Sequence, residues 1–178
     1  KAETIKSVEN CQPVLVTIIL PFFNEKELIE SCIRSIFCQQ VNQIEWQLLA
    51  VNDQCTDGSE ILVKNLFASK QNAKLLHNPH KGKKQALLHG IQHADGQLII
   101  TIDADVYYPL HWLQTLVDSY RQSKAKLLIG PVVIRSAKNI FQQFQQIDFM
   151  SLVGSGAGAA RLNRPIMCNG ANLAFEKA

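Results

Sequence analysis

Two kinds of hydrophobic pattern alternate along this chain. Short apolar runs rich in β-branched residues predict buried strands, because both faces of such a run need cover. The last run contains Pro131, which predicts an irregular strand near a sheet edge. The predicted strands are Val14–Leu20, Gln47–Asn52, Lys74–His77, Leu98–Ile102 and Lys126–Val133.

Longer segments between these runs repeat apolar residues every three or four positions, which predicts amphipathic helices. Asp57 and Glu60 stand like a capping pair at the start of the second helix. The stretch Gly154–Ala160 is rich in Gly and Ala, and we expect a mobile loop there. The predicted helices are Glu25–Cys38, Asp57–Ser69, Lys83–Ala94, Leu110–Gln122 and a fifth around Ile140, Phe144 and Ile147.

This alternation predicts an α/β fold, a mostly parallel sheet with helices on both faces. A length of 178 residues fits one domain. We expect residues 1–13 to be a lead-in and residues 14–178 to form that domain. Ligands in such sheets bind beyond the carboxyl ends of the strands. Candidate chemistry should therefore stand in the residues that directly follow each strand.

Composition narrows the classes of function. Hydrophobic residues make up 47% and charged residues 19%, which is typical of a globular domain. A net charge of +3 is too small to favour a nucleic-acid partner. The five cysteines form no C-x-x-C pair, which predicts free thiols in a reducing compartment. We expect a cytoplasmic location, at the inner face of the cell membrane if membrane segments lie outside Lys1–Ala178.

Asp103 and Asp105 directly follow the buried run Leu98–Ile102. Two adjacent carboxylates repel each other unless a cation joins them. Hard oxygen ligands favour Mg²⁺ or Mn²⁺, and these ions in turn bind diphosphates. Asp53 also follows a buried strand, where it can accept a hydrogen bond from a base or a ribose, or simply complete a turn. Asn24 has a similar place, and it can be a ligand contact or a helix cap.

The segment His80–Lys84 is basic and opens a predicted helix. Cations at a helix N-terminus are opposed by the helix dipole, so a nucleotide diphosphate there would compensate them. For Lys81 and Lys84 a solvated surface is the favoured interpretation. His89 and His93 are four residues apart, but without an H-E-x-x-H pattern they are better explained as a surface pair.

Taken in order, five segments resemble the family 2 glycosyltransferases, which have the GT-A fold. The resemblance covers nearly the whole chain from Val14 onward. It departs from the family at Cys55, where Ser is usual, and at Leu88, where Asn or Ser is commoner. The segments are Val16–Glu25, Leu49–Ser59, Gly82–Ile91, Ile99–Pro109 and Cys168–Phe175.

The resemblance implies metal-dependent, inverting transfer of a sugar from a nucleotide sugar, UDP in most members, to a sugar or lipid-linked acceptor in cell-envelope polysaccharide synthesis. Mn²⁺ or Mg²⁺ is the implied cofactor, with Asp105 as its ligand and Asp103 near the ribose, the sugar and the metal. Asp53 would contact the base and Lys83 would approach the nucleotide. The nucleoside pocket would include Pro21, Asn24 and Glu25, and the donor sugar and acceptor would border Asn169, Gly170, Ala171 and Asn172.

Inverting members of the family place their general base in an acidic element downstream of the segment matched by Cys168–Phe175. We therefore expect the base beyond Ala178 and assign no catalytic base here. The chain by itself is expected to be a poor transferase or an inactive one.

Two alternatives compete with this interpretation. One is a non-catalytic domain that binds nucleotide sugars. The other is a phosphatase of the haloacid dehalogenase class, with Asp103 as nucleophile. The phosphatase is disfavoured because its D-x-D motif should open the fold, whereas three predicted strand–helix units precede Asp103.

Overall fold

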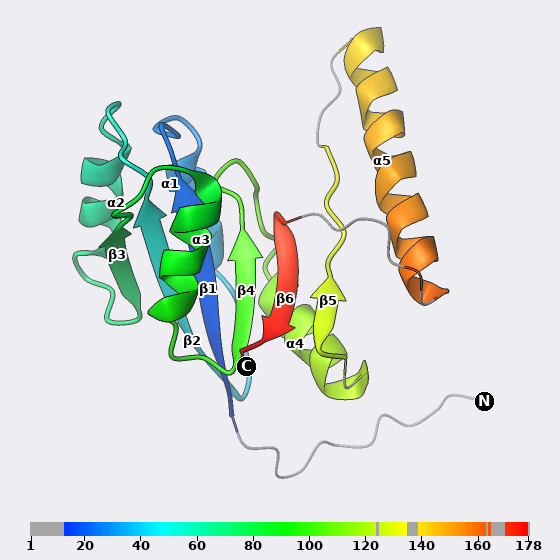
Figure 1. Ribbon diagram of the computed structural model, residues 1–178, viewed down its shortest axis with the longest axis horizontal. Coiled ribbons are helices and arrows are strands. Elements are labelled where there is room, and N and C mark those ends of the chain that lie inside the picture. Colours follow the sequence, from blue (N-terminus) through cyan, green and yellow to red (C-terminus); the bar gives the residue numbers. More distant parts are fainter. Residues whose placement is uncertain (1–12, 124, 135–138, 163, 165–169, 178) are drawn as a thin grey trace.

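The structure is a computed structural model that describes residues 13–123, 125–134, 139–162, 164 and 170–177 (Figure 1). Strands and helices alternate along most of this length. The strands are β1 (Val14–Phe22), β2 (Ile44–Asn52), β3 (Ala73–His77), β4 (Leu98–Ile102), β5 (Leu127–Ile129) and β6 (Asn172–Glu176). The helices are α1 (Ile29–Phe37), α2 (Ser59–Phe67), α3 (Lys83–Gln92), α4 (Trp112–Ser123) and α5 (Ile140–Arg161).

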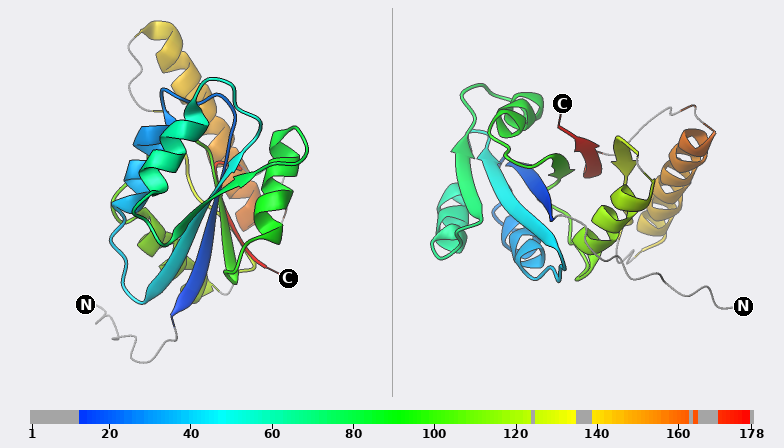
Figure 2. Two further views of the ribbon diagram at one scale, coloured as in Figure 1. Left: turned by 90° about the vertical axis from the view of Figure 1, so that its left-hand side faces the viewer. Right: turned by 90° about the horizontal axis from the view of Figure 1, so that it is seen from below.

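The six described strands form one sheet in the order β3-β2-β1-β4-β6-β5. The pairs β1–β2, β1–β4 and β2–β3 are parallel, whereas β6 runs antiparallel to both β4 and β5. Helices cover both faces, with α3 on one side and α1, α2 and α4 on the other (Figures 1 and 2). The predicted α/β fold with a mostly parallel sheet is confirmed.

The central strand β1 has apolar side chains on both faces because a helix layer covers each. Val16, Ile18 and Leu20 are fully buried in the cluster shared with α1, α2 and α4. Ile19 points to the other face and packs against α3. A Cβ built on Gly90 of α3 would lie 2.6 Å from Cγ2 of Ile19, so glycine allows this close approach.

The register of the parallel strands brings their carboxyl ends to one edge of the sheet. Phe22, the last residue of β1, pairs with Asn52, the last residue of β2. Asp53 then donates its N–H to the carbonyl of Phe22 at 3.0 Å. The segment that follows Ile102 leaves β4 at the same edge. This edge is where the sequence predicts the site.

The structure corrects three predicted elements in the C-terminal third. The expected loop Gly154–Ala160 lies inside α5, since Ser155 and Ala157 separate its glycines and no proline interrupts the helix. The predicted strand Lys126–Val133 is reduced to Leu127–Ile129. The strand β6 was not predicted, because its residues belonged to a segment interpreted only by its family resemblance.

The starts of two helices also differ from their predictions. The first helix begins at Ile29 rather than at Glu25. Gly58, with φ of 91°, precedes α2 at the N-cap position, and Asp57 instead accepts hydrogen bonds from the N–H and Oγ of Ser59 at 3.0 and 2.5 Å. Glu60 does not reach back to Asp57, and its carboxylate binds Lys64 and Asn52 instead.

The helix α5 stands apart from the sheet, beyond β5 (Figures 1 and 2). Ile140, Phe144 and Ile147 lie on one of its faces and are 85%, 66% and 69% exposed. None of the helices in the described residues is long and apolar enough to span a lipid bilayer.

Candidate active site

A cleft of about 280 Å³ opens at the carboxyl edge of β1, β2 and β4. It brings together six residues that the sequence predicts for the site, from segments far apart in the chain. The sequence reasoning missed three others, two of them aromatic and directly beside predicted residues. The lining residues are Pro21, Phe22, Phe23, Glu25, Asp53, Lys83, Asp103, Ala104 and Asp105.

The carboxylate of Asp53 is buried, and its hydrogen bonds connect the loop after β2 to the loop between β3 and α3. Its oxygens accept the backbone N–H of Gly82 at 2.8 and 3.0 Å, and Oδ1 also accepts from Nδ2 of Asn78 at 2.7 Å. Gly82 has φ of 113°, a conformation that residues with a Cβ rarely adopt. These bonds fix the start of α3, and with it Lys83, against the end of β2.

Asn24 stabilises the wall of the cleft but does not line it. Its backbone has φ of 53°, and its side-chain oxygen accepts the N–H of Thr56 at 2.9 Å. The next residue, Glu25, donates its N–H to Oγ of Ser59 at 3.1 Å. Cys55 accepts the N–H of Asn24 on sulfur at 3.3 Å. The loops after β1 and β2 are thereby held to each other.

An ion pair crosses the cleft. Nζ of Lys83, at the start of α3, lies 2.6 Å from Oδ1 of Asp103, which follows β4. Two side chains fix the backbone of Asp103. Its carbonyl accepts a hydrogen bond from the thiol of Cys32 at 3.5 Å, and its N–H lies 3.4 Å from the hydroxyl oxygen of Tyr108. Burial raises the pKa of both Cys32, to about 12, and Tyr108. Both groups are therefore neutral supports of the loop.

The cleft has a negative electrostatic character. Among the described residues, its lining contains four carboxylates and one ammonium group. The pKa of Glu25 is raised, first by partial burial and then by the negative charges of Asp105, Asp57 and Asp103. A cation would relieve this repulsion, so Asp103 and Asp105 fit a divalent metal. The described residues contain no cluster of three or more side chains that could hold a metal ion, so water or a bound molecule would supply further ligands.

The family model for glycosyl transferase family 2 matches residues 17–175 of this chain. The chain belongs to the glycosyl transferase family 2. The match includes Asp103 and Asp105, which argues against the phosphatase alternative.

Two curated relatives are undecaprenyl-phosphate 4-deoxy-4-formamido-L-arabinose transferases. The protein from Salmonella choleraesuis (strain SC-B67) is 32% identical over 106 residues, which cover 57% of this chain and 32% of that protein. The protein from Proteus mirabilis (strain HI4320) is 32% identical over 108 residues, with the same two coverages. The chain thus spans about a third of the length of these relatives.

Solved structures confirm the GT-A fold. The mannosyltransferase PcManGT from Pyrobaculum calidifontis, in complex with GDP-Man and Mn²⁺, aligns with a TM-score of 0.68 and 22% identity over 90% of this chain and 44% of that one. TarS 1–349 from S. aureus, in complex with UDP-GlcNAc, aligns with a TM-score of 0.60 and 19% identity over 70% of this chain and 36% of that one.

The segment Asn169–Asn172, which the sequence predicts to border the donor sugar and the acceptor, is described only in part. Asn169 lies outside the described residues. The carbonyl of Gly170 accepts from Oγ1 of Thr101 at 2.9 Å, and the carbonyl of Ala171 accepts from the hydroxyl of Tyr108 at 2.8 Å. These bonds attach the start of β6 to the β4 edge. Neither residue is part of the described lining of the cleft.

Asn172 was predicted to border the donor sugar and the acceptor, but its side chain is buried in the structure. Its oxygen accepts from Nε1 of Trp112 at 3.0 Å, and its nitrogen donates to the carbonyl of Pro131 at 3.2 Å. Both polar atoms are thus engaged on the side of β5 and α4. In this structure Asn172 connects secondary-structure elements and is not part of the described lining of the cleft, so its role at the substrate stays a prediction.

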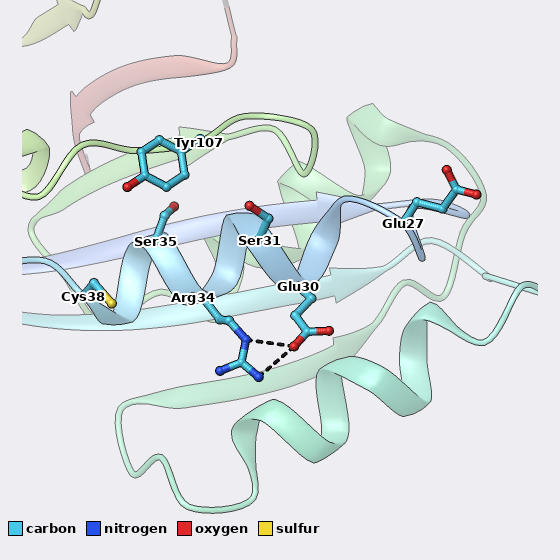
Figure 3. A pocket seen from close by; sticks show the side chains of 7 residues that line it. All are labelled: Glu27, Glu30, Ser31, Arg34, Ser35, Cys38 and Tyr107. Carbon is cyan, nitrogen blue, oxygen red and sulfur yellow. Dashed lines mark hydrogen bonds and ion pairs between the residues drawn. The ribbon is translucent and has the colours of Figure 1, made fainter. Parts of the chain in front are cut away.

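A second, larger cavity of about 450 Å³ lies on the outer face of α1 (Figure 3). There both Nε and one terminal nitrogen of Arg34 contact the same carboxylate oxygen of Glu30, at 2.8 and 2.7 Å. The cavity contains neither Asp103 nor Asp105, and only Tyr107 comes from the loop after β4. We place the chemistry in the smaller cleft because the carboxylates that follow the strands meet there. The larger cavity is lined by Glu27, Glu30, Ser31, Arg34, Ser35, Cys38 and Tyr107.

Proposed function

We propose that this domain binds a UDP-sugar together with Mn²⁺ or Mg²⁺ in the cleft and provides the donor half of an inverting sugar transfer to an acceptor hydroxyl. The observation that supports it most is the meeting of Asp53, Lys83, Asp103 and Asp105 around one cleft in a family 2 glycosyltransferase. A solved GT-A neighbour holds GDP-Man and Mn²⁺, and another holds UDP-GlcNAc.

In this proposal Asp103 and Asp105 hold the metal, and oxygens of the nucleotide complete its coordination. The metal, when bound, stabilises the negative charge that develops on the leaving diphosphate. The cleft lining has four carboxylates and only Lys83 as a positive group. A free diphosphate would be repelled by this charge. Binding of the nucleotide should therefore depend on the metal.

Asp53 is proposed to accept a hydrogen bond from the base, with Pro21, Phe22 and Phe23 forming the apolar part of the nucleoside pocket. The bonds from Gly82 and Asn78 hold the Asp53 carboxylate in one orientation, so little ordering is needed when the base arrives.

The acceptor is proposed to be a sugar or a lipid-linked molecule, reached at the inner face of the cell membrane. The names of the relatives from Salmonella and Proteus, which are undecaprenyl-phosphate transferases, support the lipid-linked class. We assign the general base to no residue of this chain, and we expect acceptor-dependent turnover to need residues beyond Ala178.

Calorimetry of UDP binding tests the donor site. Wild-type protein should bind UDP with Mn²⁺ and lose most of this affinity in EDTA. Asp105→Ala should bind UDP weakly and equally in both buffers. Asp95→Ala is the matched control, because Asp95 is exposed and precedes β4 at the opposite edge of the sheet. Equal wild-type affinity in Mn²⁺ and in EDTA would contradict the metal-dependent site.

A turnover assay separates the transferase from a non-catalytic binding domain. UDP release from a panel of UDP-sugars is measured with and without acceptors, for this chain and for a chain extended past Ala178. The proposal expects acceptor-dependent release in the extended protein only. Metal-dependent UDP binding without turnover in either protein would instead identify a binding domain.

A further inference from the structure

The ion pair between Lys83 and Asp103 occupies one of the two carboxylate oxygens through which Asp103 would hold the proposed metal. Nζ of Lys83 lies 2.6 Å from Oδ1 of Asp103, which is the short separation typical of a charge-assisted contact. The two residues come from different elements, α3 and the end of β4, and are 20 positions apart. The pair is therefore a tertiary contact across the cleft.

An ammonium group and a divalent cation cannot share this carboxylate oxygen favourably. Like charges within a few ångströms repel each other, and the repulsion is stronger where the walls exclude part of the water. Asp103 is the less accessible partner, with a side chain 25% exposed. Binding of a metal through Oδ1 of Asp103 thus requires that Lys83 withdraw.

The side chain of Lys83 is free to make this movement. Its side chain is 57% exposed and has a flexible stem, so that Nζ can swing without moving α3. Its backbone stays in place because Gly82, the preceding residue, is fixed by both oxygens of Asp53. The cleft between Lys83 and Asp105 is where the diphosphate would lie, and its oxygens would attract the released ammonium group.

We propose that Lys83 is an exchangeable counter-ion, which neutralises Asp103 in the empty cleft and transfers to the diphosphate when metal and nucleotide bind together. This inference rests on the proposed function. Lys83 thereby has two opposite effects. It competes with a metal that arrives alone, and it favours a metal that arrives with a nucleotide. The coupling between the two ligands is larger than their direct contact would give.

Because Lys83 is proposed to oppose metal binding without nucleotide and to favour it with nucleotide, one substitution should shift the two affinities in opposite directions. Lys83→Met removes the charge and retains much of the stem. Mn²⁺ affinity without nucleotide is measured from the electron paramagnetic resonance of free Mn²⁺, and UDP affinity at saturating Mn²⁺ by calorimetry. We expect Lys83→Met to bind Mn²⁺ alone about two- to fivefold more tightly, in keeping with a partly exposed ion pair. It should bind UDP with Mn²⁺ at least tenfold more weakly, because a charge-assisted hydrogen bond is lost.

Lys84→Met is the matched control. Lys84 is the next residue of α3, is exposed, and does not line the cleft. It should change both affinities by less than about twofold, since an exposed charge outside the cleft is screened. Lys83→Gln provides a second variant of different polarity, in case the methionine side chain disturbs the cleft.

The outcomes separate this inference from the proposed function. Wild-type protein that binds no UDP in Mn²⁺ contradicts the proposed function itself. Wild-type protein with metal-dependent UDP binding, combined with unchanged or weaker Mn²⁺ binding in both Lys83 variants, overturns the counter-ion and leaves the function standing. Tighter Mn²⁺ binding with unchanged UDP affinity overturns the transfer of Lys83 to the diphosphate.

Discussion

The carboxylate of Asp53 accepts the backbone N–H of Gly82 on both of its oxygens, at 2.8 and 3.0 Å, across 29 positions of sequence. Asp53 directly follows β2 and Gly82 precedes α3, so this contact sets the place of Lys83 in the cleft. Asp53, which was predicted as a ligand contact, therefore also stabilises the fold by holding the start of α3 to the end of β2. The two roles can be separated because one affects folding and the other affects UDP binding.

Asp53→Asn should reduce both stability and UDP affinity. The amide retains one acceptor oxygen but presents an N–H group to the N–H of Gly82, and it loses the charge that strengthens these bonds. We expect a loss of about 1–3 kcal/mol in the free energy of unfolding, measured in denaturant. UDP affinity should fall while its dependence on Mn²⁺ remains. Unchanged unfolding would contradict the structural role, and Asp95→Asn serves as the exposed control.

The sequence predicted that several of the candidate residues meet at one edge of the sheet, because they directly follow buried strands. Asp53 and Asp103 were located by the buried runs before them, and parallel strands bring their carboxyl ends to one edge. The partners of these side chains could not be predicted in the same way. Asn78 and Gly82 contact Asp53 only because the loop before α3 folds back over β2, which no local pattern indicates.

The C-terminal third was predicted less well for a related reason. The strand β6 pairs antiparallel with both β4 and β5, so its neighbours are distant in sequence and its own five residues are a weak signal. The side chain of Asn172 was expected at the substrate because of its motif, yet its polar atoms bind Trp112 and Pro131. A motif identifies a segment but not the face to which each side chain points.

Glu25→Gln should raise the melting temperature at neutral pH in metal-free buffer. Partial burial and the charges of Asp105, Asp57 and Asp103 raise the pKa of Glu25 in the folded state. Its stabilising contribution is therefore present at low pH and is lost as the pH rises through the raised pKa.

Wild-type Glu25 is charged and repelled at pH 7, whereas glutamine is not, so the advantage of the variant should shrink toward pH 4. Thermal melts in EDTA at both values measure this difference, with the exposed neighbour Glu27→Gln as the control. An equal difference at pH 7 and pH 4 would show that Glu25 does not feel these charges.

Gly90→Ala should destabilise the domain, whereas Gly158→Ala should not. A Cβ at Gly90 would lie 2.6 Å from Cγ2 of Ile19 and 3.3 Å from Cγ2 of Val51, in the packed layer between α3 and the sheet. We expect a loss of about 1–3 kcal/mol from overpacking, despite the better helix propensity of alanine. Gly158 lies in α5, with no atom within 4 Å of such a Cβ, so alanine should be neutral or stabilise by up to about 1 kcal/mol. Equal effects of the two substitutions in denaturant unfolding would contradict this packing of α3.

Glu176→Gln should leave UDP binding and turnover unchanged, although Glu176 is the last carboxylate of the chain. The structure holds it firmly, since it belongs to β6 and its side chain accepts from the hydroxyl of Tyr120 at 2.9 Å. It pairs with Leu98, however, at the amino end of β4. The cleft begins at Asp103, five residues further along, which corresponds to about 16 Å of strand. A general base must lie within hydrogen-bond reach of the acceptor hydroxyl, so Glu176 is too distant.

The variant should lose at most about 1 kcal/mol of stability with its hydrogen bond to Tyr120. UDP affinity in Mn²⁺ should stay within about twofold of wild type, because an exposed polar substitution at the opposite edge leaves the cleft intact. The deciding measurement is acceptor-dependent UDP release in the chain extended past Ala178. A large loss of release in Glu176→Gln, with UDP affinity unchanged, would place the base on β6. The acceptor would then have to approach from the edge of the sheet opposite Asp103, and the orientation that we propose for the donor in the cleft would be wrong.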